Sequence, residues 1–398
     1  MSTRADWTHL FARRQSARGG EELAAILAGT PPGVLPLTGG FPNPATFATD
    51  ALGEIAARVL REEPGLALQY TPVEGIPGVR EYLAGRQEEL QGRRPDPAEL
   101  MITSGGMECI ALACAAMLDP GDAIAVEGPT YLGALMAFRG AEADVHEIPM
   151  DEDGLVVDAL EERLADGLRP KLLYVIPEYQ NPTGRTLPLE RREALVELCR
   201  RHGVLILEDV AYRELAWGAK PLPSLWSLAP DVVVQAGTFS KVFFPGVRLG
   251  WAAGPEEVVA QLAAAKANTD QCASALAQRM VEEYGRGGHF DRELPRAREL
   301  YASHWRALDG ALREHMPAGV SWTEPTGGFL TWVELPEQLD ALALRDAATE
   351  CGVAYVPGAP FYASDAGANE LRLSFSALGE ADLAEAGERL AEVIRAAL

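Results

Sequence analysis

The sequence contains little lysine and has an overall shortage of positive charge. Lysine occurs at four of 398 positions, and arginine supplies the other basic side chains. Acidic residues number 58 against 35 basic residues, which gives a formal net charge of -23. Because such a chain repels polyanions, the composition argues against nucleic acid or an anionic membrane surface as a partner.

Cysteine is scarce, and long apolar stretches are absent. The five cysteines show no CxxC spacing, so we expect buried free thiols and a reducing, cytoplasmic location. No uninterrupted apolar stretch is long enough to span a bilayer, and residues 1–20 lack the apolar core of a signal peptide. A Gly-x-Gly-x-x-Gly turn after the first strand is also missing, which argues against a nicotinamide-binding dehydrogenase.

Short apolar runs alternate with helical patterns through most of the chain. This alternation is typical of an α/β fold with a mostly parallel sheet between two layers of helices. From about residue 289, a long polar helix precedes alternating segments that predict a smaller antiparallel sheet with one solvent-exposed face. We therefore expect an N-terminal arm over residues 1–45 that packs with the small domain. A large domain over 46–288 and a small α+β domain over 289–398 follow.

Lys241 lies on a tight connection between two apolar runs, within Gly237-Thr-Phe-Ser-Lys241-Val-Phe-Phe-Pro-Gly-Val-Arg248. Because phenylalanines flank it, its ammonium loses hydration, which lowers the pKa and favours an amine that attacks carbonyl groups. Thr238, Ser240 and Arg248 supply hydroxyls and a guanidinium that suit a phosphate. The stretch alone fits two interpretations equally. One is a buried loop whose lysine extends toward solvent, and the other is a site for a phosphate-bearing aldehyde such as pyridoxal 5'-phosphate (PLP).

Polar side chains follow the carboxyl ends of several predicted strands, the edge at which open parallel sheets bind ligands. At one of these ends, Gly105 and Gly106 form a turn before Met107, where a helix begins and free backbone N–H groups suit an anion. The convergence of such residues with a buried lysine predicts a single site. The side chains at or just beyond strand ends are Ser104, Tyr131, Asn181, Asp209, Tyr212 and Lys241.

Two further arginines have alternative interpretations. Arg372 lies between Leu371 and Leu373 in a predicted strand, so it either faces solvent or points inward and binds a carboxylate through two parallel hydrogen bonds. Residues 4–28 predict a helical region that is broken at Gly19 and Gly20. Arg18 in this region is either a surface residue or a group that contacts the substrate.

Together these residues resemble the fold-type I PLP enzymes, specifically the class I and II aminotransferases. The resemblance covers nearly the whole chain, and within the family it is strongest to the 2-aminoadipate aminotransferase group. The motifs that carry it occur in family order and at family spacing: Asn181-Pro-Thr-Gly184, Asp209 with Tyr212, Ser240-Lys241 and Leu371-Arg372-Leu-Ser374. The same core is fused to a DNA-binding head in MocR-type regulators.

The resemblance implies a role for each matching residue. Lys241 forms the Schiff base with PLP and moves the substrate proton, Asp209 pairs with the pyridinium nitrogen, and Arg372 binds the substrate α-carboxylate. Tyr131 stacks on the cofactor ring, and Tyr70 reaches the phosphate in the neighbouring subunit, which implies a homodimer. Other residues share these tasks: Tyr212 and Asn181 at the ring oxygen; Gly105, Gly106, Met107, Thr238, Ser240 and Arg248 at the phosphate; Gly40 and Asn181 near the substrate.

The resemblance implies transfer of an amino group between an L-amino acid and a 2-oxo acid, with 2-oxoglutarate as one acceptor and no metal ion. Another PLP reaction, β-elimination or oxidative deamination, is an alternative because it uses most of the same residues. A PLP-binding regulator is a weaker alternative, since the core begins near residue 30 and the acidic chain has no basic DNA-binding head. The segment before Gly20 lacks the substrate-reading arginine at the place where the aminoadipate enzymes carry it. The sequence therefore leaves the amino donor open.

Overall fold

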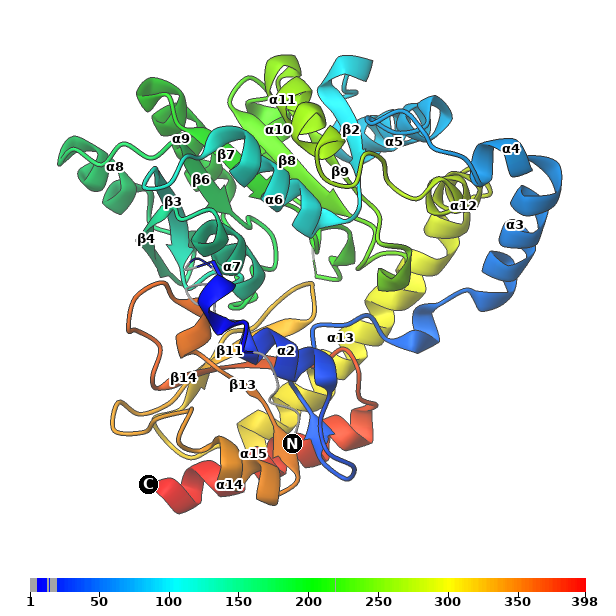
Figure 1. Cartoon of the computed structure of the whole chain (residues 1–398). Helices are drawn as coiled ribbons and strands as arrows, with labels where there is room; N and C mark the ends of the chain where they lie inside the picture. Colours follow the sequence, from blue (N-terminus) through cyan, green and yellow to red (C-terminus); the bar gives the residue numbers. More distant parts are fainter. Residues whose placement is uncertain (1–5, 13, 15–19, 219) are drawn as a thin grey trace.

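The structure, a computed structural model, describes residues 6–12, 14, 20–218 and 220–398 (Figure 1). Within these residues the largest sheet has the strand order β2-β9-β8-β7-β6-β3-β4-β5. The strands β8, β7, β6, β3 and β4 run parallel to one another, whereas β9 is antiparallel to β2 and β8, and β5 is antiparallel to β4. The predicted mostly parallel sheet is confirmed. Its strands are β2 (Leu100–Thr103), β3 (Ala123–Gly128), β4 (Asp144–Asp151), β5 (Gly154–Leu155), β6 (Leu172–Val175), β7 (Leu205–Asp209), β8 (Val233–Thr238) and β9 (Gly250–Ala253).

Helices cover both faces of this sheet. Successive side chains along each strand point to opposite faces, and they belong to two different hydrophobic clusters. In β6, Leu172 and Tyr174 pack with α6 (Gly106–Met117), α7 (Leu132–Gly140) and α11 (Glu256–Ala267). Leu173 and Val175 belong to the cluster that contains α5 (Pro77–Gln91), α8 (Val157–Ala165), α9 (Leu189–His202) and α10 (Leu225–Leu228). The loops that follow the carboxyl ends of β6, β7 and β8 contain Asn181, Tyr212 and Lys241.

The second sheet has the order β10-β11-β14-β13 and is antiparallel, as predicted. The prediction of a solvent-exposed face is wrong for its central strands, since residues 330–333 and 371–374 are all buried. Trp332 packs with Ile26 of the N-terminal segment on one side, while Val333 belongs to the cluster that contains the C-terminal helices. The strands are β10 (Ser321–Trp322), β11 (Leu330–Glu334), β13 (Val356–Pro357) and β14 (Glu370–Ser374).

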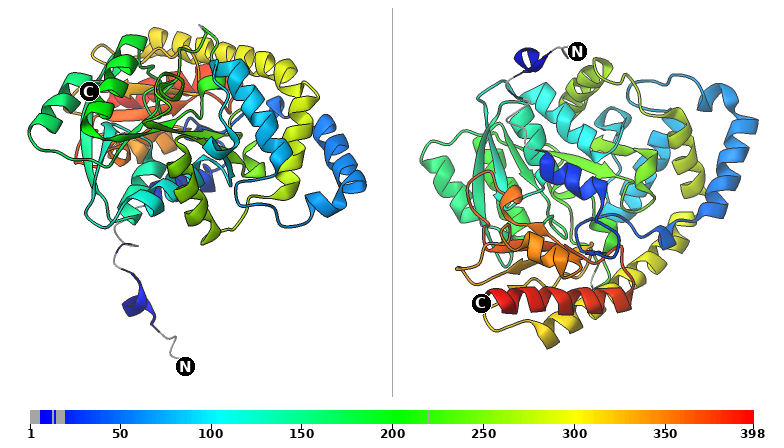
Figure 2. Two further views of the ribbon diagram at one scale, coloured as in Figure 1. Left: turned by 90° about the horizontal axis from the view of Figure 1, so that it is seen from above. Right: turned by 60° about the horizontal axis from the view of Figure 1, so that its bottom comes forward.

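One long helix, α13 (His289–His315), runs from the region of the large sheet to the small sheet (Figure 1). The C-terminal helix α15 (Glu380–Ala397) lies beside it (Figure 2). A methyl group added at Gly387 of α15 would come within 2.8 Å of the Ala311 side chain. Glycine therefore permits the close approach of the two helices. Near the amino end, β1 (Leu35–Pro36) pairs in parallel with β12 (Val353–Ala354). The residue limits of the three predicted segments stay a prediction.

The predicted helical region over residues 4–28 lies partly outside the described residues. The described parts are the short helix η1 (Thr8–Leu10) and α2 (Glu21–Ala28), and Arg18 lies outside them. No helix of the described residues is both long and apolar enough to cross a membrane. The remaining elements are α3 (Thr49–Glu62), α4 (Pro64–Ala67), α12 (Ala275–Arg286), α14 (Arg345–Glu350) and the short helices η2 (Pro44–Thr46), η3 (Pro97–Glu99), η4 (Arg213–Leu215), η5 (Pro245–Val247) and η6 (Ala359–Phe361).

Candidate active site

Lys241 lies just beyond the end of β8, on the connection to β9, as the sequence predicts. Its Nζ donates a hydrogen bond to the Gly40 carbonyl oxygen at 2.7 Å. The same Nζ lies 5.7 Å from the ring centroid of Tyr212 and 5.9 Å from that of Phe329. Burial, together with the nearby Arg372 guanidinium, lowers the pKa of the Lys241 amine to about 8. A substantial fraction of this amine is therefore neutral and nucleophilic near physiological pH.

Asp209 ends β7 and is buried. Its carboxylate accepts hydrogen bonds from the Tyr174 hydroxyl at 2.8 Å and from the Ala211 backbone N–H at 3.1 Å. Burial raises the pKa of Asp209, although both hydrogen bonds and the nearby Lys241 ammonium oppose the shift. A desolvated carboxylate of this kind favours a cationic partner.

Asn181 connects the two ends of the site. Its amide Nδ2 donates to the Tyr212 hydroxyl at 3.5 Å, and its Oδ1 accepts from Arg372 Nη1 at 3.1 Å. Tyr212 packs edge to face on Phe329, with ring centroids 5.6 Å apart, and burial raises its pKa. The structure thus brings the predicted residues Asn181, Tyr212 and Arg372 together, although they come from three separate segments.

Arg372 points inward from β14 and is only 4% exposed, so the solvent-facing alternative is wrong. Its Nη2 donates to the Thr38 carbonyl oxygen at 2.5 Å, and its guanidinium lies 5.0 Å from the Phe361 ring centroid. Burial lowers its pKa to about 10. The Nε atom is buried and has no hydrogen-bond partner among the described residues. A buried guanidinium with unused donor capacity suits an additional anion such as a carboxylate.

A second group of predicted residues gathers where α6 begins. Gly105 has a positive φ of 100°, and a methyl group added there would lie 2.8 Å from Arg248 Nη2. Arg248 Nη1 donates to the Ser240 hydroxyl at 3.3 Å, and the Thr238 hydroxyl accepts from the Ser240 N–H at 3.1 Å. The other members of the group are Gly106 and Met107, the first two residues of α6. Backbone donors, two hydroxyls and a guanidinium around a helix N-terminus form a suitable anion site.

The two remaining predicted aromatic residues, Tyr131 and Tyr70, differ from each other in burial. Tyr131 is half-buried and immediately precedes α7 at the edge of the sheet. Burial raises its pKa, and the Asp209 carboxylate raises it further. Tyr70 is 80% exposed on the connection between α4 and α5. The structure therefore does not bring Tyr70 into the site of its own chain.

Tyr174 and Thr38 contact the site but were not identified from the sequence. Tyr174 is fully buried and carries the only side-chain hydroxyl within β6, so a polar group in an apolar strand was the available signal. Thr38 contributes its backbone carbonyl to Arg372. A backbone contact leaves no signature in residue type, and therefore no signal could have identified it.

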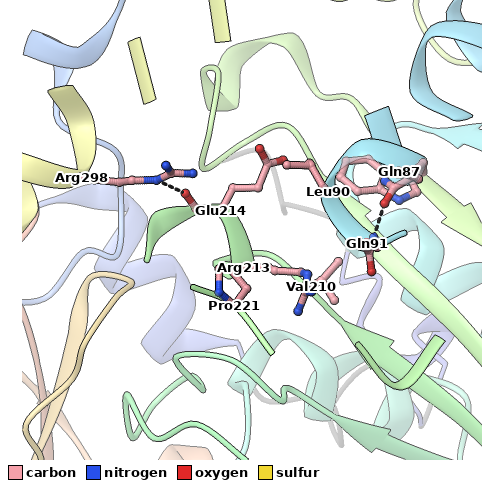
Figure 3. A pocket seen from close by; sticks show the side chains of 9 residues that line it. Gln87, Leu90, Gln91, Val210, Arg213, Glu214, Pro221 and Arg298 are labelled. Carbon is pink, nitrogen blue, oxygen red and sulfur yellow. Dashed lines mark hydrogen bonds between the residues drawn. The ribbon is translucent and has the colours of Figure 1, made fainter. Parts of the chain in front are cut away.

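The loop that follows Asp209, the last residue of β7, carries Tyr212 and is held by contacts with other elements. A cavity of about 100 Å³ lies there between the loop, α5 and α13 (Figure 3). The Glu214 carbonyl oxygen accepts from Arg298 Nε at 2.8 Å, and Arg213 forms an ion pair with Glu178. These contacts hold Arg213 and Glu214, the two residues that directly follow Tyr212.

Several known proteins are similar to this chain over most of its length. The model of the family described as aminotransferase class I and II matches residues 43–390. The chain is 38% identical to a 2-aminoadipate transaminase of Thermus thermophilus, with 98% of each chain covered. It is also 38% identical to aromatic-amino-acid aminotransferase 1 of Thermococcus litoralis, over 91% of this chain and 88% of that protein.

A solved structure shows the same fold. It is that of LysN, the alpha-aminoadipate aminotransferase of Thermus thermophilus, in complex with N-(5'-phosphopyridoxyl)-L-leucine. The TM-score is 0.92 at 37% identity, with 98% of this chain and 99% of that chain covered.

Proposed function

Because the chain belongs to the class I and II aminotransferase family, which depends on PLP, we propose that Lys241 is the residue that binds this cofactor covalently. The protein is an aminotransferase, which moves an amino group between an amino acid and a 2-oxo acid. The assignment of Lys241 is supported by its position just beyond a strand end and by the lowered pKa of its amine.

The residues around Lys241 fit PLP at both ends of that molecule. The anion site at the start of α6 suits the phosphate, and we assign it to Gly105, Gly106, Met107, Thr238, Ser240 and Arg248. Asp209 suits the pyridine nitrogen, because a cation there satisfies a buried carboxylate. Asn181 and Tyr212 suit the ring oxygen, and Tyr131 suits the ring face. When bound, the cofactor supplies an electron sink that stabilises negative charge at the substrate Cα.

A single relationship carries the proposal for the substrate. The Thr38 carbonyl accepts from Arg372, and the Gly40 carbonyl accepts from Lys241. Two carbonyls that are two residues apart thus contact the buried Arg372 guanidinium and the Lys241 amine. An α-amino acid carries its carboxylate and its amino group on one carbon, so its carboxylate can bind Arg372 while its amino group takes the place of the Lys241 amine. We propose that Arg372 binds the carboxylate and that Gly40 and Asn181 line the same place.

Lys241 then acts as the proton carrier. Its neutral amine removes the proton from the substrate Cα, and the resulting ammonium is stabilised by the Gly40 carbonyl. The rings of Tyr212 and Phe329, whose centroids lie 5.7 and 5.9 Å from the amine, limit the access of water to it. The inward Arg372 offers a carboxylate-binding group that every 2-oxo acid can use, and we propose 2-oxoglutarate as one acceptor.

We also propose that the enzyme is a homodimer to which Tyr70 contributes across the interface. Tyr70 is 80% exposed, and Leu66 and Leu68 on the same segment are 42% and 68% exposed. An exposed cluster of large apolar side chains favours burial against a second copy. All five cysteines are free thiols, which supports the proposed cytoplasmic location.

A half-reaction tests the proposed reaction. Purified holoenzyme is mixed with single amino acids without any oxo acid, and the absorbance of the cofactor is recorded together with ammonia. We expect conversion to the aminated cofactor with one oxo acid per site and no ammonia. Continued release of ammonia would show that elimination or oxidation dominates. Lys241→Ala should lose the absorbance band of the covalently bound cofactor, and retention of that band would contradict the assignment.

A further inference from the structure

Lys266 is completely buried, although it lies outside the group of residues assigned above. It lies in the last turn of α11, and its Nζ donates to Glu108 Oε2 at 2.7 Å. The same Nζ donates to the two carboxylate oxygens of Asp270 at 2.7 and 2.8 Å. An ammonium has three donors, and these contacts use all of them. A lysine desolvated in this way costs free energy unless its partners are held in place.

Both carboxylates also contact Ser104, the residue before Gly105. The Ser104 hydroxyl donates to Asp270 Oδ2 at 2.5 Å, and the Ser104 backbone N–H donates to Glu108. Glu108 belongs to the first turn of α6. Lys266 therefore joins the two carboxylates that fix the backbone and the side chain of Ser104, the residue that precedes the proposed phosphate loop, residues 105–107.

The charges of this cluster bear on the same loop. Burial raises the pKa of Glu108, and the hydrogen bond from Lys266 opposes that shift. Without Lys266, two carboxylates would lie beside the loop assigned to the phosphate dianion. Like charges placed close together destabilise one another. Lys266 neutralises one of the two charges while contacting neither Lys241 nor Arg248 in the described residues.

We propose that Lys266 is a positioning residue for the phosphate loop, which it holds through Glu108, Asp270 and Ser104, and that it thereby favours the phosphorylated cofactor over unphosphorylated pyridoxal. This inference rests on the proposed binding of PLP at Lys241. Lys266 acts through other residues, since its side chain does not reach the assigned ligand groups.

The test compares two ligands that carry the same aldehyde and differ in the phosphate. Full-length protein is freed of cofactor and titrated with PLP and with pyridoxal, and the absorbance of the Lys241-bound product is recorded. In Lys266→Met we expect the dissociation constant for PLP to rise by at least about 10-fold, because the loss of a buried charge partner affects the phosphate site. The constant for pyridoxal should change by less than about 3-fold, as expected for a ligand without the charged group. Equal changes for both ligands, or no change for either, would overturn the proposal.

Two further variants keep the test decisive. Ser104→Ala removes the link to Asp270 while leaving Lys266 paired, so it should weaken PLP selectively even if Lys266→Met does not fold. Lys171→Met is the matched control, since Lys171 forms an ion pair with Asp122 at 46% side-chain exposure on the surface. If the wild-type protein gave no absorbance change with PLP that depends on Lys241, the proposed function itself would fail. That outcome is distinct from unselective weakening in the variants.

Discussion

Tyr174 and Asp209 lie on adjacent parallel strands, β6 and β7, and the Tyr174 hydroxyl donates a hydrogen bond to Asp209 Oδ2 at 2.8 Å. This bond supports the ionised carboxylate within a buried site, and it lowers the Asp209 pKa that burial raises. Tyr174 packs edge to face on Phe138, with ring centroids 5.5 Å apart, which fixes the direction of the hydroxyl. The pair thus connects the core of the large sheet to the proposed partner of the cofactor nitrogen.

Tyr174→Phe should therefore raise the pKa of Asp209 and move the acid limb of the pH profile of kcat to higher pH. A hydrogen bond to a charged group contributes about 1.5–3 kcal/mol, so kcat should fall by about 10- to 100-fold. The measurement is the pH dependence of kcat together with the pH titration of the bound cofactor's absorbance. Tyr355→Phe is the control, because its buried hydroxyl donates to the Ala341 carbonyl at 2.7 Å, outside the candidate site. An unchanged pH profile in Tyr174→Phe would contradict this role.

The strand-end residues were predictable from the sequence because their positions follow from local patterns. An apolar run fixes the strand, and polar residues at or just beyond its end then lie at its carboxyl edge, as observed for Asp209 and Lys241. The direction of Arg372 was not predictable, since alternation distinguishes the two faces only when one face is wet. Both faces of β14 are buried, so neighbouring leucines and an inward arginine coexist.

Lys266 shows a different limit of sequence reasoning. Its spacing from Asp270 matches a helical i,i+4 ion pair, which is usually a surface feature of modest energy. Its burial depends on the packing of α11 against α6, which brings Glu108 from 158 positions away. Tertiary packing thus converts an ordinary surface pattern into a buried cluster, and the sequence around Lys266 carries no record of that packing.

Arg372→Lys should weaken amino-acid binding while leaving the cofactor in place. Lysine keeps the charge but loses the two parallel donors of the guanidinium. Loss of a partner for a buried charge costs at least about 2 kcal/mol, which corresponds to an increase in KM of about 30-fold. The measurement is KM for the amino donor alongside the dissociation constant of PLP. Arg191→Lys is the control, because Arg191 binds both oxygens of Asp151 at 2.6 and 2.7 Å away from the site. A loss of PLP affinity by about 10-fold with unchanged KM would assign Arg372 to the cofactor instead.

The lowered pKa of Lys241 predicts a pH dependence of stability in the cofactor-free protein. Below its folded pKa of about 8, the amine is protonated in both the folded and the unfolded chain, so its contribution is constant. Between about 8 and its ordinary value of 10.5, the unfolded chain binds the proton while the folded protein does not. The free energy of unfolding contributed by this group therefore rises with pH in that range.

The comparison that isolates this effect is wild type against Lys241→Met, since other titrating groups are common to both. We expect the wild-type melting temperature to rise relative to that of Lys241→Met as the pH increases from about 7.5 to 9.5. Thermal unfolding followed by circular dichroism at a series of pH values measures it. If the difference stayed constant or fell with pH, the amine would not be desolvated in the folded protein.

The proposed position of Tyr70 across a dimer interface predicts that two inactive variants restore one another. Lys241→Ala lacks the amine, and Tyr70→Ala lacks the hydroxyl that the neighbouring site uses. In a mixed dimer, one site then combines the intact Lys241 of one subunit with the intact Tyr70 of the other. Random exchange makes about half of the dimers mixed, each with one working site, so activity should reach about a quarter of the wild-type value.

The exchange is carried out by denaturation and refolding of the dilute mixture, and activity is compared with that of each variant refolded alone. A mixture of Lys241→Ala with Arg372→Ala is the control that should stay inactive. Lys241 and Arg372 serve the same site from one chain, through carbonyls of residues 38–40, so each site of that mixed dimer lacks one of the two groups. Recovery with Tyr70→Ala but not with Arg372→Ala therefore assigns Tyr70 to the neighbouring site.

Subunits that carry different affinity tags show how many mixed dimers form, so a failure to exchange is recognised directly. If mixed dimers of Tyr70→Ala and Lys241→Ala formed but stayed inactive, Tyr70 would serve the site of its own chain or the mixed dimer would need both copies. A tandem fusion in which only one of the two subunits carries Tyr70→Ala separates these two outcomes. It keeps one working site if Tyr70 serves the site of its own chain, and it is inactive if both copies are needed. A mixture of Tyr70→Ala with Arg372→Ala would be inactive in both cases. Because Tyr70 is 80% exposed in the single chain, a role in its own site would require the segment to move toward that site rather than toward a partner.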